Sequence, residues 1–91
     1  MEFEFPNNKE ELINIHNRLF YEFLKSNYKV ELCIRNYTED IIVSLLHYNK
    51  GYEHNNKSIT FYPFSSLEKL KEQEQIAMEV LKNNKLIEQE F

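Results

Sequence analysis

The chain has 91 residues, a net charge of −4 and 42% apolar residues, which is enough apolar material for one core without disulfide or metal cross-links. Its single cysteine, Cys33, excludes an intramolecular disulfide, and its single glycine excludes a glycine-rich phosphate-binding loop. We therefore predict one small domain over residues 1–91, whose acidic balance disfavours direct binding to a nucleic-acid backbone and favours protein partners.

The N-terminal part predicts a helix that ends near Lys25. Asn7 with Glu10, or Asn8 with Glu11, has the spacing of a capping box at the start of a helix. Apolar side chains then recur at three- and four-residue spacing and predict one broad buried face, made of Leu12, Ile15, His16, Leu19, Phe20, Phe23 and Leu24. Before this helix, residues 1–5 could add a short extra N-terminal strand.

Three strands are predicted in the middle of the chain. From Tyr28 to Arg35 the apolar period changes to two, with Val30, Leu32 and Ile34 on one face, which indicates a half-buried strand. Turn-forming residues follow over 36–40, and the β-branched start of 41–48 indicates a second strand. A polar, exposed loop over 49–57 leads to a third strand over 58–62.

The segment Ile41–Tyr48 has a second interpretation. Thr38 could cap a short helix that pairs Ile41 with Leu45 and ends at Gly51. The preceding strand, however, needs a pairing partner, and a hairpin is the simplest source of one. A strand is therefore the preferred prediction.

The C-terminal part predicts a second helix and a short tail. Ser65 with Glu68 has capping-box spacing, and the helix continues to about Lys82. Its predicted inward face consists of Leu67, Leu70, Ala77, Val80 and Leu81. Residues 85–91 are predicted to form either a short helical turn or a tail fastened by Leu86, Ile87 and Phe91. The order of these predicted elements along the chain indicates an α+β fold in two layers: a helix, a three-stranded antiparallel meander and a second helix.

No catalytic, cofactor-binding or metal-binding constellation is predicted. His16, Cys33, His47 and His54 lack the spacing of a metal site. Cys33 has no base beside it in the strand pattern, so it is interpreted as a plain strand residue rather than a nucleophile. The hypothesis of a small enzyme or enzyme subunit would depend on Cys33 or His47.

Two surfaces are candidates for binding a partner. Glu72, Glu74 and Glu79 on the second helix are predicted to present an acidic strip to a basic partner surface. The alternative is an ordinary solvated helix face in which charges pair along the helix. Tyr48 and Tyr62 would anchor a protein partner or a homodimer on the outer sheet face, unless they close the edge of the core instead.

The predicted element order resembles that of double-stranded RNA-binding domains. Such domains bind phosphates through basic residues at the start of the last helix, positions that Lys69 and Lys71 occupy here. This resemblance implies an alternative function, nucleic-acid binding through Lys50, Lys57, Lys69 and Lys71. The same order, the small size, the acidity and a composition typical of AT-rich codons are also similar to some phage-encoded inhibitors of CRISPR nucleases.

The preferred function is a small non-catalytic binding or regulatory protein that acts through protein–protein contacts. A phage or mobile-element inhibitor of a host nucleic-acid-handling enzyme is the version we expect, with a partner that carries a basic surface. The acidic N-terminus has no secretory-signal pattern, and the apolar runs are far shorter than the about 20 residues of a membrane-spanning helix. A cytoplasmic location is therefore expected.

Overall fold

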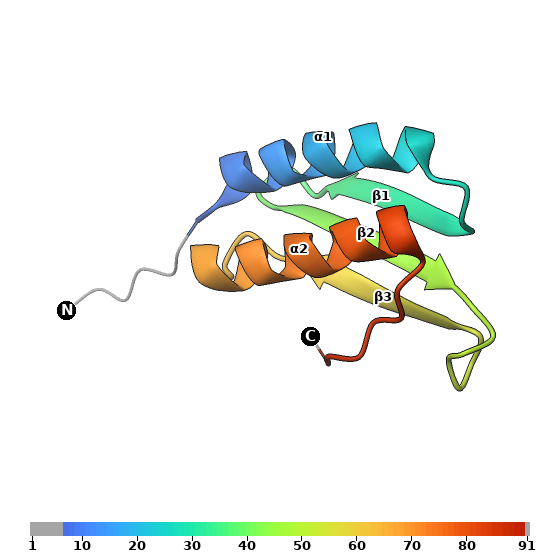
Figure 1. The fold of residues 1–91 in the computed structure, drawn as a ribbon. Coiled ribbons are helices and arrows are strands. Elements are labelled where there is room, and N and C mark those ends of the chain that lie inside the picture. The colour runs from blue at the N-terminus through green and yellow to red at the C-terminus, as the bar shows by residue number, and fades with distance from the viewer. Residues whose placement is uncertain (1–6, 91) are drawn as a thin grey trace.

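In a computed structural model of the chain, which describes residues 7–90, two helices lie side by side over one face of a three-stranded sheet (Figure 1). The elements are α1 (Lys9–Lys25), β1 (Val30–Asn36), β2 (Ile41–Tyr48), β3 (Asn56–Phe61) and α2 (Leu67–Asn83). The predicted α+β order of helix, antiparallel meander and helix is confirmed. The extra N-terminal strand predicted for residues 1–5, and the predicted anchor Phe91, fall outside the described residues.

The sheet is a meander with β2 at its centre. β1 pairs antiparallel with β2 from Val30 opposite His47 onward, and β2 pairs antiparallel with β3 from Val43 opposite Phe61 onward. The segment 41–48 is therefore a strand, and the alternative helix is wrong. Its burial alternates strictly between buried and half-buried residues, because one face meets the helices and the other faces away from them.

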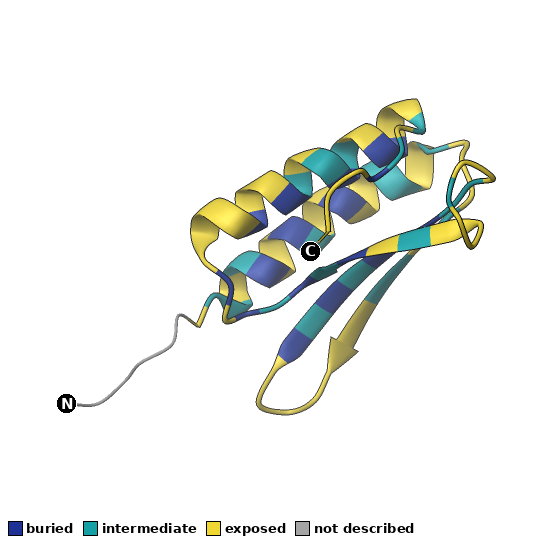
Figure 2. Cartoon of the chain, turned by 90° about the horizontal axis from the view of Figure 1, so that it is seen from below, coloured by how far each residue is buried: buried dark blue, intermediate teal, exposed yellow. Residues whose placement is uncertain are grey.

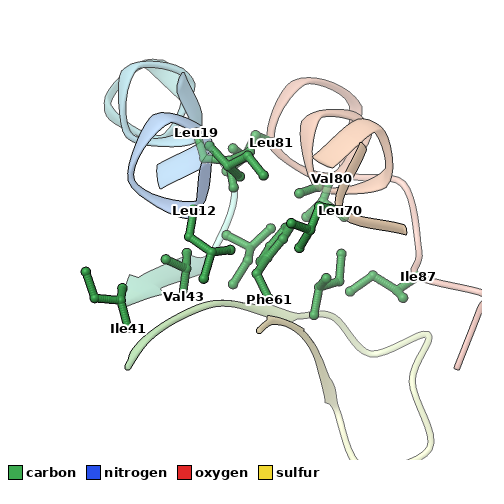
Figure 3. Packing of buried hydrophobic residues seen from close by; sticks show 13 residues of the cluster. Leu12, Leu19, Ile41, Val43, Phe61, Leu70, Val80, Leu81 and Ile87 are labelled. Carbon is green, nitrogen blue, oxygen red and sulfur yellow. The ribbon is translucent and has the colours of Figure 1, made fainter. Parts of the chain in front are cut away.

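The core lies between the sheet and the two helices (Figure 3). Its fully buried side chains come from every layer: Leu12 and Leu19 of α1, Val43, Leu45, Ile59 and Phe61 of the sheet, and Ala77 and Val80 of α2. Ile87 of the predicted tail is also buried, which confirms that this segment is fastened to the domain. All of these side chains lie on the helix side, so no element of residues 7–90 covers the opposite face of the sheet (Figure 2).

α1 buries a narrower face than its periodicity predicts. Leu12, Ile15 and Leu19 are buried, but Phe20 is 45% exposed and Leu24 is 66% exposed. The reason is position: the buried residues face α2 and the sheet, whereas the other two lie on a flank that nothing in residues 7–90 covers.

The predicted capping box at the start of α1 does not form. Asn8 is the N-cap residue but makes no side-chain cap hydrogen bond. Its Nδ2 instead donates to the Ser65 carbonyl at 2.8 Å, which ties the start of α1 to the turn before α2. A tertiary contact thus takes the place of the local one.

α2 also differs in detail from the prediction. Its cap is Ser66 rather than Ser65, and the Ser66 Oγ accepts a backbone N–H three residues on. Leu67, predicted to face inward, is 58% exposed because it stands at the first position of the helix, before the turn that meets the sheet. Gln73 is buried instead, and its Nε2 donates to the Thr60 carbonyl of β3 at 3.0 Å. An amide in the buried face was not predicted.

Candidate functional site

The uncovered face of the sheet, called the outer face here, carries side chains in rows across the strands. These rows follow from the register: Arg35–Ile42, Cys33–Ser44–Thr60, Glu31–Leu46–Ser58 and Tyr48–Asn56. The second row holds only small side chains, while Ile42 and Leu46 on either side of it are half buried. The outer face is therefore partly apolar, and its middle row of small side chains forms a shallow depression between larger side chains.

Tyr48 and Tyr62 lie at opposite ends of this face. The ammonium of Lys29 sits over the Tyr48 ring, 5.0 Å from its centroid, and partial burial, followed by the neighbouring Glu31, raises the pKa of Tyr48. Tyr62 directly follows the inward-facing Phe61 and stacks on Phe64, with ring centroids 5.0 Å apart. Because β2 and β3 run in opposite directions, about six residues of strand, or about 20 Å, separate the two tyrosines. They would act as two anchors rather than one cluster.

The predicted acidic strip on α2 is divided by a contact between the helices. Glu74 turns toward α1, where its Oε2 accepts the Arg18 Nε–H at 2.7 Å and its Oε1 accepts the Nη2–H at 2.9 Å. The Nη2 of Arg18 also donates to Glu11 at 2.8 Å. This hydrogen bond lowers the pKa of Glu11, and the two carboxylates raise the pKa of Arg18. Glu74 thus helps to join the helices and is not a free surface group.

Glu72 and Glu79 remain on the exposed side of α2. Helical spacing adds Glu68 to the same line, so the acidic row consists of Glu68, Glu72 and Glu79. The Glu79 Oε2 accepts a hydrogen bond from Asn83 at 2.9 Å. Nearby lysines of the same helix interrupt the negative charge, which weakens this row as a docking surface.

The Arg18 bridge predicts a small effect of substitution. We expect Arg18→Ala to lower the free energy of unfolding by about 0.5–1 kcal/mol, because the Arg18 side chain is 48% exposed and water weakens its ion pairs, even though Glu74 is mostly covered. The loss should shrink in concentrated salt, which screens such pairs. Urea denaturation at low and high salt measures it, with Lys85→Ala as a control outside any ion pair of residues 7–90. An effect of equal size at both salt concentrations would contradict the ion-pair explanation.

A buried polar network joins the far end of the sheet to the C-terminal segment. His47 is fully buried, with Nδ1 at 2.8 Å from the Tyr52 hydroxyl and Nε2 at 2.7 Å from the Asn84 Oδ1. The Tyr52 hydroxyl also accepts the Ile87 N–H at 2.7 Å. The hydroxyl can in turn donate its own proton to His47 Nδ1, an arrangement in which the imidazole Nε2–H donates to Asn84 Oδ1. Each buried side-chain polar atom of the network has a hydrogen-bond partner, which indicates a structural role.

This network was missed at the level of sequence. Tyr52 falls in the loop predicted to be exposed, yet it is half buried, and β3 begins at Asn56 rather than Ser58. The one available signal was the inward position of His47 in the alternation of its strand. Cys33 lies on the outer face and His47 on the inner face, so the two groups named for an enzyme hypothesis do not meet.

The four lysines named for nucleic-acid binding lie at two ends of the domain. Lys50 lies in the β2–β3 loop and Lys57 at the start of β3, whereas Lys69 and Lys71 lie at the start of α2, at the opposite end of the sheet (Figure 1). Lys57 also forms an ion pair with Glu90, with 3.1 Å between Nζ and Oε1. These lysines therefore do not form one basic patch.

A groove of about 640 Å³ runs between α2 and the C-terminal segment. Ile76, Met78 and Leu86 supply its apolar lining, and the remaining lining side chains are charged or amide groups. None of the lining residues is fully buried, so the groove lacks the convergent buried polar groups that orient a small ligand.

Comparisons of the chain with protein-family models, with curated proteins and with solved structures find no match. Within residues 7–90, no group of three or more His, Cys, Asp or Glu side chains is placed to hold a metal ion. No helix in that range is long and apolar enough to cross a membrane. Among the surfaces described, the outer face combines accessibility, apolar side chains and aromatic anchors, and it is the candidate site.

Proposed function

We propose that this protein is a non-catalytic binding protein that holds a protein partner on its outer face and inhibits or regulates that partner. The observation that carries the proposal is the outer face itself, on which Ile42 and Leu46 lie half buried between Tyr48 and Tyr62, with no element of residues 7–90 packed over them. Antiparallel sheets that meet water on one side ordinarily carry polar side chains there. Aliphatic side chains at these two positions therefore support a protein contact.

The layout of the face suits such a contact. Tyrosines bury a large area while tolerating water at their hydroxyl ends, which is why they are frequent anchors of interfaces. The row of Cys33, Ser44 and Thr60 leaves room for a protruding partner side chain between the apolar rows.

The negative charge of the chain indicates which kind of protein partner it would bind. The chain has a net charge of −4, and the acidic row of α2 adds to the negative field. Charges outside the contact mainly raise the rate of association with an oppositely charged partner. The proposed partner is therefore a protein with a basic surface, of the kind that nucleic-acid-handling enzymes carry.

The test compares two surfaces of the same chain. Ile42→Lys combined with Leu46→Lys changes the outer face at half-buried positions, and circular dichroism verifies that the fold is retained. Glu72→Gln combined with Glu79→Gln changes the acidic row and leaves the Arg18 bridge intact. Each variant and the wild type are used for affinity purification from an extract of the native cells, with quantitative mass spectrometry. The recovered partner is then purified and its affinity for each chain is measured by calorimetry.

We expect the outer-face variant to lose at least about tenfold in affinity for the partner, because two charges would be buried in the contact. The acidic-row variant should bind with similar affinity and associate more slowly. The opposite pattern would assign the partner to α2 and overturn the proposal. Salt-dependent binding of duplex RNA or DNA by the purified chain would favour the nucleic-acid alternative.

A further inference from the structure

The two edges of the sheet are covered to different extents. At the β3 edge, Gln73 donates a hydrogen bond to the Thr60 carbonyl, and the C-terminal segment is held near the start of the strand by the Lys57–Glu90 ion pair. β1 pairs with β2 on one side, and no element of residues 7–90 pairs with its other side. An edge strand with free N–H and C=O groups is a template for another strand.

The register shows which backbone groups of β1 are free. The Tyr48 N–H donates to the Lys29 carbonyl at 3.0 Å, so Lys29 and every second residue after it face β2 with their N–H and C=O groups. Val30, Leu32 and Ile34 therefore direct theirs away from the sheet, where another strand could bind them.

Exposed apolar side chains accompany this free edge. On α1, Ile13, Phe20 and Leu24 are 38%, 45% and 66% exposed, and their spacing places them on one flank of the helix. On β1, Ile34 faces the helix layer yet is 42% exposed, and the end of β1 is exposed beside the alternating burial of β2 (Figure 2). Several exposed apolar side chains on neighbouring elements beside one free edge are what an interaction site provides.

We propose that this edge binds a second copy of the chain, with the two β1 strands paired antiparallel about a twofold axis at Cys33. In that register, Leu32 lies opposite Ile34 of the second copy, and both use their free backbone groups for hydrogen bonds. Glu31 lies opposite Arg35 of the second copy, and the twofold axis repeats the pair. A surface that is complementary to itself in this way is the requirement for an isologous dimer.

Charge excludes the neighbouring registers. An axis at Glu31 or at Arg35 would place like charges directly opposite each other. An axis at Leu32 would place Lys29 opposite Arg35 of the second copy. An axis at Ile34 would leave Glu31 and Arg35 without an opposite charge. Among axes on residues 31–35, Cys33 alone gives both charged residues an oppositely charged partner.

The helix layer fits the same arrangement. α1 packs over β1 and β2 alike. With neighbouring strands about 4.8 Å apart, the α1 axes of the two copies would stand about 10 Å apart, which is within the range of packed helices. The exposed flanks of α1 would then cover each other and the exposed part of β1.

The dimer would join two outer faces into one six-stranded surface. The outer face of one copy covers about 350 Å², well below the about 800 Å² that each partner buries in a standard interface. The two outer faces of a dimer together have an area close to that of one side of a standard interface. The dimer itself is inferred from the β1 edge and the α1 flank, so it does not depend on the proposed function.

Cys33 is a native reporter of the register. On the axis, the two cysteines form a non-hydrogen-bonded pair with Cα atoms about 4.5 Å apart, within the range of a disulfide. Diamide accepts the two electrons and two protons released when two thiols form a disulfide. We expect it to convert the full chain to a covalent dimer on a non-reducing gel. Cys33→Ser combined with Ser58→Cys moves the thiol toward the β3 edge of the outer face and should remain monomeric on the gel.

The oligomeric state provides the second measurement. Sedimentation equilibrium of the wild type should show a dimer, and Phe20→Glu, at an exposed position, should weaken dimerisation at least about tenfold without unfolding the chain. Glu31→Arg and Arg35→Glu should each weaken the dimer, whereas both changes together should restore it. A monomer at all concentrations, or a dimer that ignores these changes and gives no Cys33 cross-link, would overturn the inference.

Discussion

His47→Leu is expected to lower the free energy of unfolding by about 2–4 kcal/mol. The leucine fills much of the buried volume but leaves the Tyr52 hydroxyl proton and the Asn84 Oδ1 without partners, and each such loss costs about 1–3 kcal/mol. Urea denaturation measures the change. Hydrogen exchange of the Ile87 amide should also accelerate, because the tyrosine that accepts its N–H loses its own fixed orientation.

His54→Leu is the matched control. His54 lies exposed in the β2–β3 loop, so the same substitution there should change the free energy of unfolding by less than about 0.5 kcal/mol. If the two variants were equally stable, the hydrogen-bonded network would not hold the C-terminal segment to the sheet.

The order of elements was predictable because each change of apolar period marks a change of structure. The alternation from Val30 onward and the helical spacing from Leu12 onward are local signals that tertiary contacts reinforce. The segment Ile41–Tyr48 was open to two interpretations because its apolar pairs fit both periods. Pairing with a neighbour on each side determined it, and such pairing is not a local property.

The extent of burial was less predictable. Periodicity identifies apolar positions on a helix, but it does not say how much of a broad apolar face other elements cover. Phe20 and Leu24 are exposed for this reason, and the same exposure supports the proposed dimer.

The roles of several polar side chains were not predicted either, because they depend on contacts with other elements of the fold. Arg18 binds Glu74 across 56 positions of sequence, and Gln73 reaches the backbone of β3. Helical spacing alone assigned Glu74 to the acidic strip. The outer face was more accessible to prediction, since strand alternation identifies Tyr48, but the distance from Tyr48 to Tyr62 requires the strand directions.

Phe61→Ala is expected to be among the most destabilising substitutions in the sheet, with a loss of about 3–5 kcal/mol. Phe61 is fully buried in β3 at the centre of the core, so removing its ring leaves a cavity that the helices and β2 cannot fully close (Figure 3). A domain of this size has a total free energy of unfolding of about 5–15 kcal/mol. Thermal denaturation should therefore show a fall in Tm of more than about 10 °C.

Phe64→Ala makes the same chemical change three residues later, where the ring is 57% exposed and stacks on Tyr62. We expect a loss below about 1 kcal/mol there, because the ring is already largely in water. Similar losses at both positions would mean that β3 does not carry the core. A large loss at Phe61 with little at Phe64 would place the stabilising layer on the helix side of the sheet.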